Sequence, residues 1–188
     1  ELFAVRIHRS GYHSNAALNS EFTWIDALAK AGIHVPEVLP CANGKRFAVV
    51  EHQNIPEPRQ IDVLQWIAGE QLGSVEDGLG ENAAQIEHIY STIGRKMAHL
   101  HAHSSQWVPP AGFVRQAWDH AGLVGETPLW GRFWELEVLT TAQRSLIKAA
   151  RKSLAADLSL IDCGPSNYGM IHADFVPENL LVNDHDIR

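Results

Sequence analysis

Hydrophobic and polar positions follow two different periods along the chain, and the first third is typical of β-structure. Runs rich in branched and aromatic residues predict strands at residues 2–8, 47–50 and 61–67. Residues 15–31 instead carry apolar side chains at a spacing close to 3.6, which predicts a helix. Ser14 or Asn15 can cap this helix, and Gly32 ends it.

After a linker at residues 66–70 the pattern becomes mainly helical. The clearest helix is predicted at residues 82–103, where one stripe contains Ile86, Ile89, Ile93, Met97 and Leu100. A second helix is predicted from Thr140 or Thr141 to about Leu160. Its expected inward-facing residues are Leu146, Ile147, Ala150, Leu154 and Leu158.

Composition indicates a folded globular protein and excludes several functions. Of the 188 residues, 45% are hydrophobic and 20% are charged, which suffices for a core. Fifteen basic against 22 acidic residues give a net charge of -7, which argues against a general nucleic-acid binder. No apolar run approaches the roughly 18 residues that cross a bilayer. Cys41 and Cys163 are far apart, as expected for reduced cysteines in a cytoplasmic protein.

Residues 171–182 carry the most informative motif. His172, Asp174 and Asn179 form the pattern H-x-D-x-x-x-x-N between short apolar runs at residues 168–171 and 180–182, and a turn is predicted at 183–186. Phosphoryl transfer needs a carboxylate beside the attacking hydroxyl and a neutral oxygen ligand for the metal on the phosphates. A loop of this length lets both groups converge. Alternatively, Asp174 forms a turn and Asn179 caps a helix.

Two charged residues upstream fit the same chemistry. Arg6 lies in the first predicted strand and Glu21 in the helix that follows. In kinases a basic strand residue binds the α- and β-phosphates and pairs with a helix glutamate. An arginine fork suits phosphate oxygens. His8 should share a strand face with Arg6 and is therefore a rival for the phosphate contact.

Together these segments resemble the aminoglycoside phosphotransferase and choline kinase-like family of small-molecule kinases. The matching segments are residues 5–9, 20–28, 65–70, 93–104 and 171–182. Ala173 stands where protein kinases usually carry arginine, which favours the small-molecule branch.

The resemblance implies an α+β, two-lobed protein-kinase-like fold. Residues 1–69 would form a small, strand-rich nucleotide-binding lobe, incomplete here, and residues 70–188 a larger helical lobe, also partial. The chain starts and stops within strand-like segments, so we expect it to be part of a longer protein. The resemblance places a glycine-rich strand pair before Leu2 and a second metal-binding aspartate after a strand near Ile187.

The resemblance also implies the cofactors and the site. ATP and Mg²⁺ would be bound, and the γ-phosphoryl group would pass to a hydroxyl of an aminoglycoside, amino alcohol or homoserine-like acceptor. The implied catalytic residues are Asp174 as base and His172 as loop organiser, with Asn179 as metal ligand. The nucleotide would be bound by Arg6 and Glu21 and by the hinge residues Trp66, Ile67 and Ala68.

Other clusters have weaker claims. Asp119 could meet a cationic acceptor, although a lone aspartate in a loop is usually a turn or cap residue. His99 and His103 have a zinc-helix spacing but lack an obvious third ligand. The aromatic segment 130–134 is interpreted as core. Two further functions remain open, namely a pseudokinase-like nucleotide-binding regulatory module and a Ser/Thr protein kinase.

Overall fold

The computed structural model describes residues 2–74, 82–183 and 186–187. The chain forms two compact units. The first contains residues 1–113 and 170–188, and the second contains residues 114–169. Every residue proposed above for nucleotide binding or catalysis belongs to the first unit.

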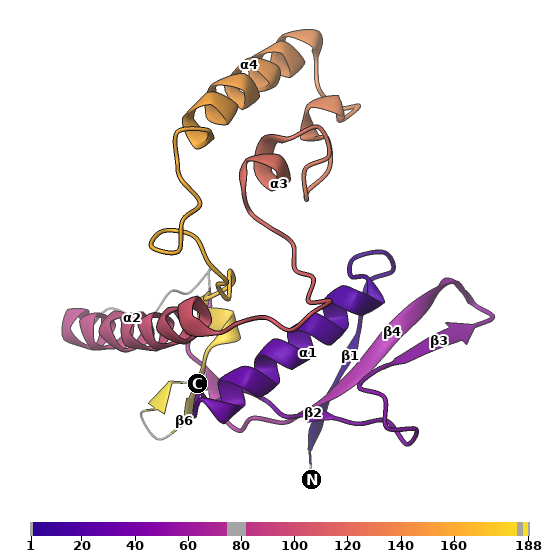
Figure 1. The fold of residues 1–188 in the computed structure, drawn as a ribbon, viewed down its shortest axis with the longest axis vertical. Helices are drawn as coiled ribbons and strands as arrows, with labels where there is room; N and C mark the ends of the chain where they lie inside the picture. The colour runs from indigo at the N-terminus through magenta and orange to yellow at the C-terminus, as the bar shows by residue number, and fades with distance from the viewer. Residues whose placement is uncertain (1, 75–81, 184–185, 188) are drawn as a thin grey trace. The chain divides into compact units, whose positions relative to one another are not determined.

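The first unit begins with an antiparallel sheet of four strands (Figure 1). These are β1 (Phe3–Ile7), β2 (Val38–Leu39), β3 (Ala48–His52) and β4 (Ile55–Gln65). The long β4 pairs with each of the other three strands. Its pairing with β1 sets Arg6 opposite Asp62, so the sheet brings together two charges that are 56 positions apart.

β4 starts six residues earlier than the sequence pattern predicts. Pro56 and Pro58 suggest a break there, because proline cannot donate a backbone hydrogen bond. Within the described chain, however, residues 55–59 pair only with β3. Their other side is an open edge, where proline is tolerated.

The predicted first helix is confirmed as α1 (Asn15–Lys30). Ser14 caps it, since its Oγ accepts the Ala17 backbone N–H at 3.1 Å. Leu18 and Phe22 of α1 are buried with Val38 and Leu64 against the sheet. This cluster is the sheet core of the first unit.

The remainder of the first unit is α2 (Ala83–Gln106) and a second antiparallel sheet. The predicted helix is confirmed and continues three residues beyond His103. Its sheet contains β5 (Glu70–Gln71), β6 (Leu181–Asn183) and β7 (Asp186–Ile187). Ile89 and Ile93 of α2 pack with Leu180 and Ile187. Of the turn predicted at 183–186, Asn183 pairs with Asp186, and residues 184–185 lie outside the described chain.

A third core joins the two helices. Trp24 and Leu28 of α1 are buried with Leu100 of α2, and Phe175 and Met170 pack against them. Phe175 also packs against the core beneath α2. The segment that carries the motif is therefore anchored to both helices of the first unit.

The second unit contains α3 (His120–Val124), the short 3₁₀ helix η1 (Phe133–Glu135) and α4 (Thr141–Leu158). Thr140 caps α4 through a reciprocal capping box with Gln143. In the aromatic segment Trp134 is buried, as expected for core, whereas Trp130 is 65% exposed.

The predicted inward face of α4 is wrong for three of its five residues, because Leu146, Ala150 and Leu154 are exposed. Leu146 and Leu154 are 71% and 51% exposed. The more buried stripe instead contains Ile147, Arg151 and Leu158. The Arg151 guanidinium lies 3.9 Å from the centroid of the Trp134 ring. The packed face of α4 therefore includes a long charged side chain, where the apolar pattern predicts leucines.

No helix in the described ranges is long and apolar enough to cross a membrane.

Replacing Phe22 should destabilise the first unit strongly. Phe22→Ala empties a fully buried site in the sheet core, and we expect a loss of about 3–5 kcal/mol in the free energy of unfolding. Chemical denaturation measures this loss. As a control, Tyr90→Ala removes an exposed ring from α2 and should change stability by less than about 0.5 kcal/mol. Equal effects of the two substitutions would contradict the assigned core.

Candidate active site

The structure brings Asp174 and Asn179 into direct contact. Asn179 ends the 3₁₀ helix η2 (Pro177–Asn179) and donates its Nδ2–H to Asp174 Oδ2 at 2.7 Å. The same nitrogen lies 3.1 Å from the Asp174 backbone oxygen. Because the amide nitrogen is used in this way, the Asn179 Oδ1 remains an acceptor beside the carboxylate. Both residues are exposed.

The side chain of His172 contacts the backbone of its own loop. Its Nδ1 accepts the Asp174 backbone N–H at 3.3 Å, so the ring proton of the neutral imidazole is on Nε2. The ring also meets Phe175 edge-on, with centroids 4.7 Å apart. Protein atoms around the ring desolvate it and lower the pKa of His172, although the charges of Asp174 and Glu21 oppose this shift. The neutral form is the one that can accept the Asp174 N–H.

The backbone conformation at position 173 explains why the motif has a small residue there. Its φ is +66°, in the left-handed region that residues other than glycine rarely adopt. Here the chain turns sharply enough for the His172 ring to reach the backbone of Asp174. A β-branched or bulky residue would add strain to this turn.

The other end of the loop is tied to the strand that follows β4. Gln71 donates its side-chain N–H to the Glu178 backbone oxygen at 3.2 Å, and the Leu72 N–H bonds to the Leu180 oxygen at 2.9 Å. Phe175 is partly buried and packs against two cores, so apolar and backbone contacts hold the loop in addition to the contacts among its own polar groups.

Arg6 and Glu21 are also in contact. Arg6 NH1 lies 2.9 Å from Glu21 Oε1, so the strand and the helix position one ion pair. Burial by itself lowers the pKa of Arg6, but the Asp62 hydrogen bond and the charges of Glu21 and Asp62 outweigh it and raise that pKa. Arg6 is therefore a permanent cation at this site.

Asp62 is the site residue that sequence reasoning missed. Its buried carboxylate binds Arg6 at two points, with Nε to Oδ1 at 2.7 Å and NH2 to Oδ2 at 3.2 Å. His8 Nε2 lies 2.5 Å from the same Oδ2, so His8 shares the strand face of Arg6 as expected. The available signal was a charged residue inside the apolar strand segment 61–65.

The predicted hinge residues Trp66, Ile67 and Ala68 connect β4 to β5. The segment ends at Gly69, which passes very close to β6. A Cβ placed at Gly69 would lie 3.0 Å from both Leu181 Cβ and the Val182 oxygen. A Cβ here would force its neighbours to shift by a few tenths of an ångström, and the φ of +156° also favours glycine.

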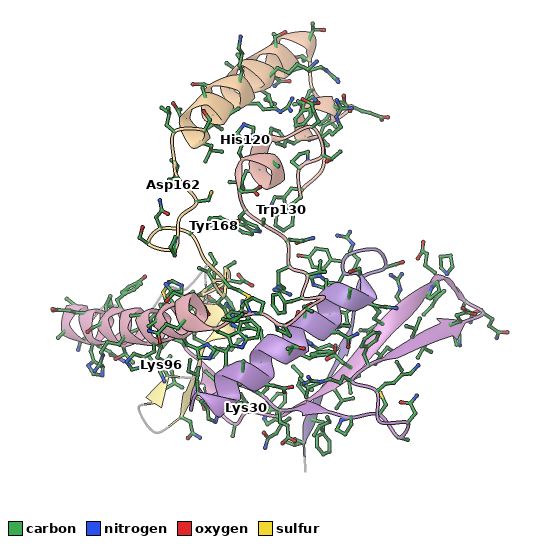
Figure 2. All side chains as sticks on the ribbon, viewed as in Figure 1. Lys30, Lys96, His120, Trp130, Asp162 and Tyr168 are labelled. Carbon is green, nitrogen blue, oxygen red and sulfur yellow. The ribbon has the colours of Figure 1, made fainter. Side chains whose placement is uncertain are left out.

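Asp119 belongs to the second unit, whereas Asp174 and Asn179 belong to the first. It caps α3, with Oδ1 accepting the Gly122 N–H at 2.8 Å. Trp118, the residue before Asp119, meets Trp130 edge-on at 6.4 Å. Trp118, Trp130 and Tyr168 are all exposed, and Figure 2 labels the last two. Burial, followed by the charges of Asp119 and Cys163, raises the pKa of Tyr168.

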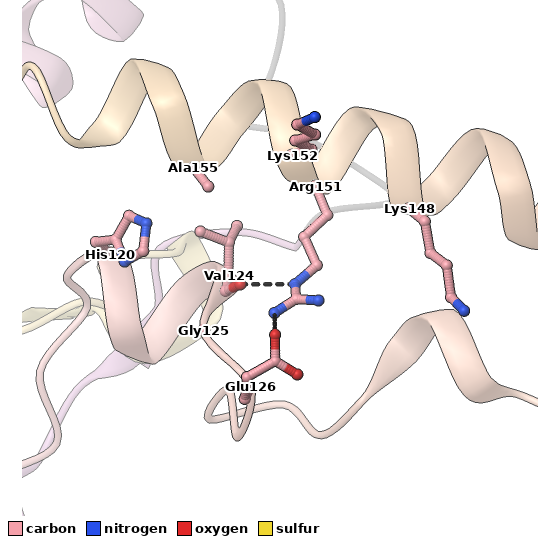
Figure 3. Close-up of a pocket in the computed structure, with 8 residues that line it drawn as sticks. All are labelled: His120, Val124, Gly125, Glu126, Lys148, Arg151, Lys152 and Ala155. Atoms are coloured by element: carbon pink, nitrogen blue, oxygen red, sulfur yellow. Dashed lines mark hydrogen bonds and ion pairs between the residues drawn. The ribbon is translucent and has the colours of Figure 1, made fainter.

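A pocket of about 410 Å³ lies between α3 and α4 of the second unit (Figure 3). Arg151 points into it, donating to the Val124 oxygen at 2.7 Å and to Glu126 Oε1 at 2.6 Å. Arg151 lowers the pKa of Glu126 through this hydrogen bond and its charge. The arginine is thus occupied in tying the loop after α3 to α4.

Within residues 2–74, 82–183 and 186–187, no group of three or more His, Cys, Asp or Glu residues could hold a metal ion. The only predicted metal ligand is Asn179, which supplies an amide oxygen beside the Asp174 carboxylate. Magnesium prefers oxygen ligands and commonly takes few from the protein when phosphates supply the rest. The donor set at this loop therefore suits such an ion.

Replacing Ala173 with glycine should stabilise the protein. Ala173→Gly removes left-handed strain, and we expect a gain of about 0.5–1 kcal/mol in the free energy of unfolding. The same chemical change at Ala98, an exposed position within α2, should cost about 0.5–1 kcal/mol. Chemical denaturation of both variants measures the sign of each change in the free energy of unfolding. A loss of stability at both positions would contradict the strained turn.

His172 should make stability depend on pH. Because the folded-state pKa is lowered, the unfolded chain, with a pKa of about 6.5, binds the proton more readily. The stability contribution of His172 is therefore present above about pH 6.5 and is lost as the pH falls below it. His172→Asn keeps an acceptor without titrating. Between about pH 8 and pH 5, the wild type should lose more stability than this variant. If the stabilities of the wild type and the variant changed in parallel over this pH range, the lowered pKa of His172 would be contradicted.

Comparison with known proteins supports one family. No curated protein sequence matches the chain. A microcompartment-associated aminopropanol kinase has a similar structure, with a TM-score of 0.73, 33% sequence identity and coverage of 95% of this chain and 52% of that one. An amicoumacin kinase in complex with AMP-PNP, Ca²⁺ and Ami has a TM-score of 0.73 at 19% identity, covering 98% and 50%.

The chain thus spans about half the length of these solved structures, and its fold is that of protein-kinase-like small-molecule kinases. Residues 2–188 match the phosphotransferase enzyme family (APH). Because this match covers almost the whole chain, the chain belongs to the phosphotransferase enzyme family.

Proposed function

We propose that the protein transfers the γ-phosphoryl group of ATP, with Mg²⁺, to a hydroxyl of a small molecule. The observation that carries this proposal is the 2.7 Å contact between Asn179 Nδ2 and Asp174 Oδ2. It leaves a carboxylate oxygen and an amide oxygen side by side on an exposed loop. These are the two groups that phosphoryl transfer requires from a kinase loop.

Asp174 would act on the acceptor. Its Oδ2 receives the Asn179 amide, so Oδ1 can receive the proton of the attacking hydroxyl. As the acceptor oxygen bonds to the γ-phosphorus, the bond from that phosphorus to the bridging oxygen breaks and ADP leaves. His172, packed against Phe175, would hold the backbone of Asp174 in place without contacting substrate.

Arg6 and Asn179 would act on the nucleotide. Arg6, oriented by Glu21 and Asp62, would bind phosphate oxygens. Asn179 Oδ1 would hold the metal, which neutralises charge on the phosphates when bound. In this proposal residues 1–69 form the nucleotide-binding lobe, with backbone groups of Trp66, Ile67 and Ala68 facing the adenine.

For the acceptor we propose an amino alcohol. The 33% identical relative is named an aminopropanol kinase, and the net charge of -7 suits a cationic molecule. Asp119 is our candidate for meeting the amine, since it lies beside the exposed Trp118 and near Tyr168. Aromatic faces and a carboxylate together favour alkylammonium groups.

The two free cysteines, Cys41 and Cys163, support a reducing, cytoplasmic location for this reaction.

Removing the proposed base should abolish turnover but not nucleotide binding. Asp174→Ala should lower kcat at least about 100-fold, the usual contribution of a positioned general base. The affinity for Mg-ATP, measured by calorimetry, should change little. Asp157→Ala, at an exposed position of α4, is the matched control and should leave both unchanged. Near-normal turnover of Asp174→Ala would refute the assignment.

The acceptor class is tested on the full-length protein with a panel of amino alcohols, aminoglycosides, homoserine and Ser/Thr peptides. Phosphorus NMR identifies the phosphate ester that forms. We expect product with a short amino alcohol. Product with peptides alone would instead support a protein kinase. Tight ATP binding without any product would support a regulatory module.

A further inference from the structure

We propose that Asp62 is a positioning residue that sets the orientation of the Arg6 guanidinium for the nucleotide phosphates. The inference rests on the proposed function and extends it to a residue outside the catalytic loop. It follows from how the two side chains meet across the sheet, from the burial of the carboxylate and from the part that His8 plays.

Two hydrogen bonds join Asp62 and Arg6 and therefore fix the orientation of the guanidinium. Arg6 and Asp62 face each other in the register of β1 and β4. Nε binds Oδ1 at 2.7 Å and NH2 binds Oδ2 at 3.2 Å, while NH1 binds Glu21 at 2.9 Å. Of the five guanidinium N–H groups, these contacts use three. One N–H on NH1 and one on NH2 remain, which can meet two oxygens of a phosphate.

The orientation matters because an arginine side chain has several rotatable bonds. The Glu21 contact alone is a single hydrogen bond, about which the guanidinium can rotate. The side-on contact with Asp62 removes this freedom before the nucleotide arrives. Binding groups held in their productive geometry gain affinity because less conformational entropy is lost on binding.

Burying the Asp62 carboxylate costs desolvation free energy, which a purely structural role does not readily explain. Asp62 is only 1% exposed. Replacing buried ion pairs by packed apolar residues is often neutral or stabilising, so a buried pair is a weak reason for stability. The position of Asp62 is better explained by what it does to Arg6.

His8 completes the arrangement. Its Nε2 lies 2.5 Å from Asp62 Oδ2, and since a carboxylate only accepts, His8 is the donor. This N–H competes with Arg6 for the charge of Asp62. Arg6 faces the carboxylates of Asp62 and Glu21. Because His8 also donates to Asp62, less of the positive charge of Arg6 is neutralised, and more remains for an anionic ligand.

The chain contains a matched pair for comparison. Arg46 is bound at two points by Asp26, at 2.6 and 2.9 Å. The guanidinium carbons of Arg46 and Arg6 lie 5.1 and 5.9 Å from the centroid of the same Phe22 ring. Both aspartate–arginine pairs thus have two hydrogen bonds and the same aromatic neighbour, although Asp26 binds Arg46 end-on through NH1 and NH2. Only the pair of Asp62 contains the proposed phosphate-binding arginine.

The test compares Asp62→Asn with Asp26→Asn in the full-length protein. Calorimetry measures the affinity for a non-hydrolysable ATP analogue with Mg²⁺. Asp62→Asn should weaken binding about ten- to a hundredfold, as expected for losing a hydrogen bond to a charged group. Asp26→Asn should change it by less than about twofold, as is usual for a substitution away from the bound ligand.

A double-mutant cycle separates positioning from general damage. In an Arg6→Met background there is no guanidinium to orient, so Asp62→Asn should no longer weaken binding further. An equal effect in both backgrounds would overturn the proposal. Unchanged affinity of Asp62→Asn while Arg6→Met weakens binding would overturn it too, with the proposed function intact. A wild type that binds no nucleotide would overturn both.

A measurement on the wild type covers the case in which Asp62→Asn does not fold. The Nε–H resonance of Arg6, identified by its absence from Arg6→Met, should exchange slowly with water because Asp62 accepts it. Exchange as fast as that of a solvent-exposed arginine would overturn the proposal.

Discussion

The first unit depends on α1, because this helix packs against two cores at once. Leu18 and Phe22 are buried against the sheet, whereas Trp24 and Leu28 are buried with Leu100 of α2. Glu21 lies between these two faces. Since tightly packed interiors resist displacement, the carboxylate that meets Arg6 cannot shift without disturbing one core or the other.

The features predicted from sequence are those determined by neighbouring residues. The loop from His172 to Asn179 closes on itself within eight positions, so its spacing suffices to predict the contact between Asp174 and Asn179. Helix caps such as Ser14 and Thr140 are likewise local. The α1 and α2 helices followed from periodicity because each buries one face against a core of its own unit.

The features that sequence reasoning missed depend on distant partners. Asp62 meets Arg6 only because β4 pairs with β1 across 56 positions, and nothing near Asp62 signals that register. The exposed Leu146 and Leu154 have a similar cause. Apolar periodicity predicts that α4 has a packed face. The face that packs, however, is the one on which Arg151 contacts the distant Trp134 ring.

Each unit contains one indole that is well shielded from water, Trp24 in the first and Trp134 in the second. Indole emission shifts to longer wavelength when solvent reaches the ring, so each tryptophan is a built-in optical reporter of its own unit. Variants that retain one or the other would let the melting of each unit be followed separately. They would show whether the unit that contains residues 172–179 unfolds independently of the other.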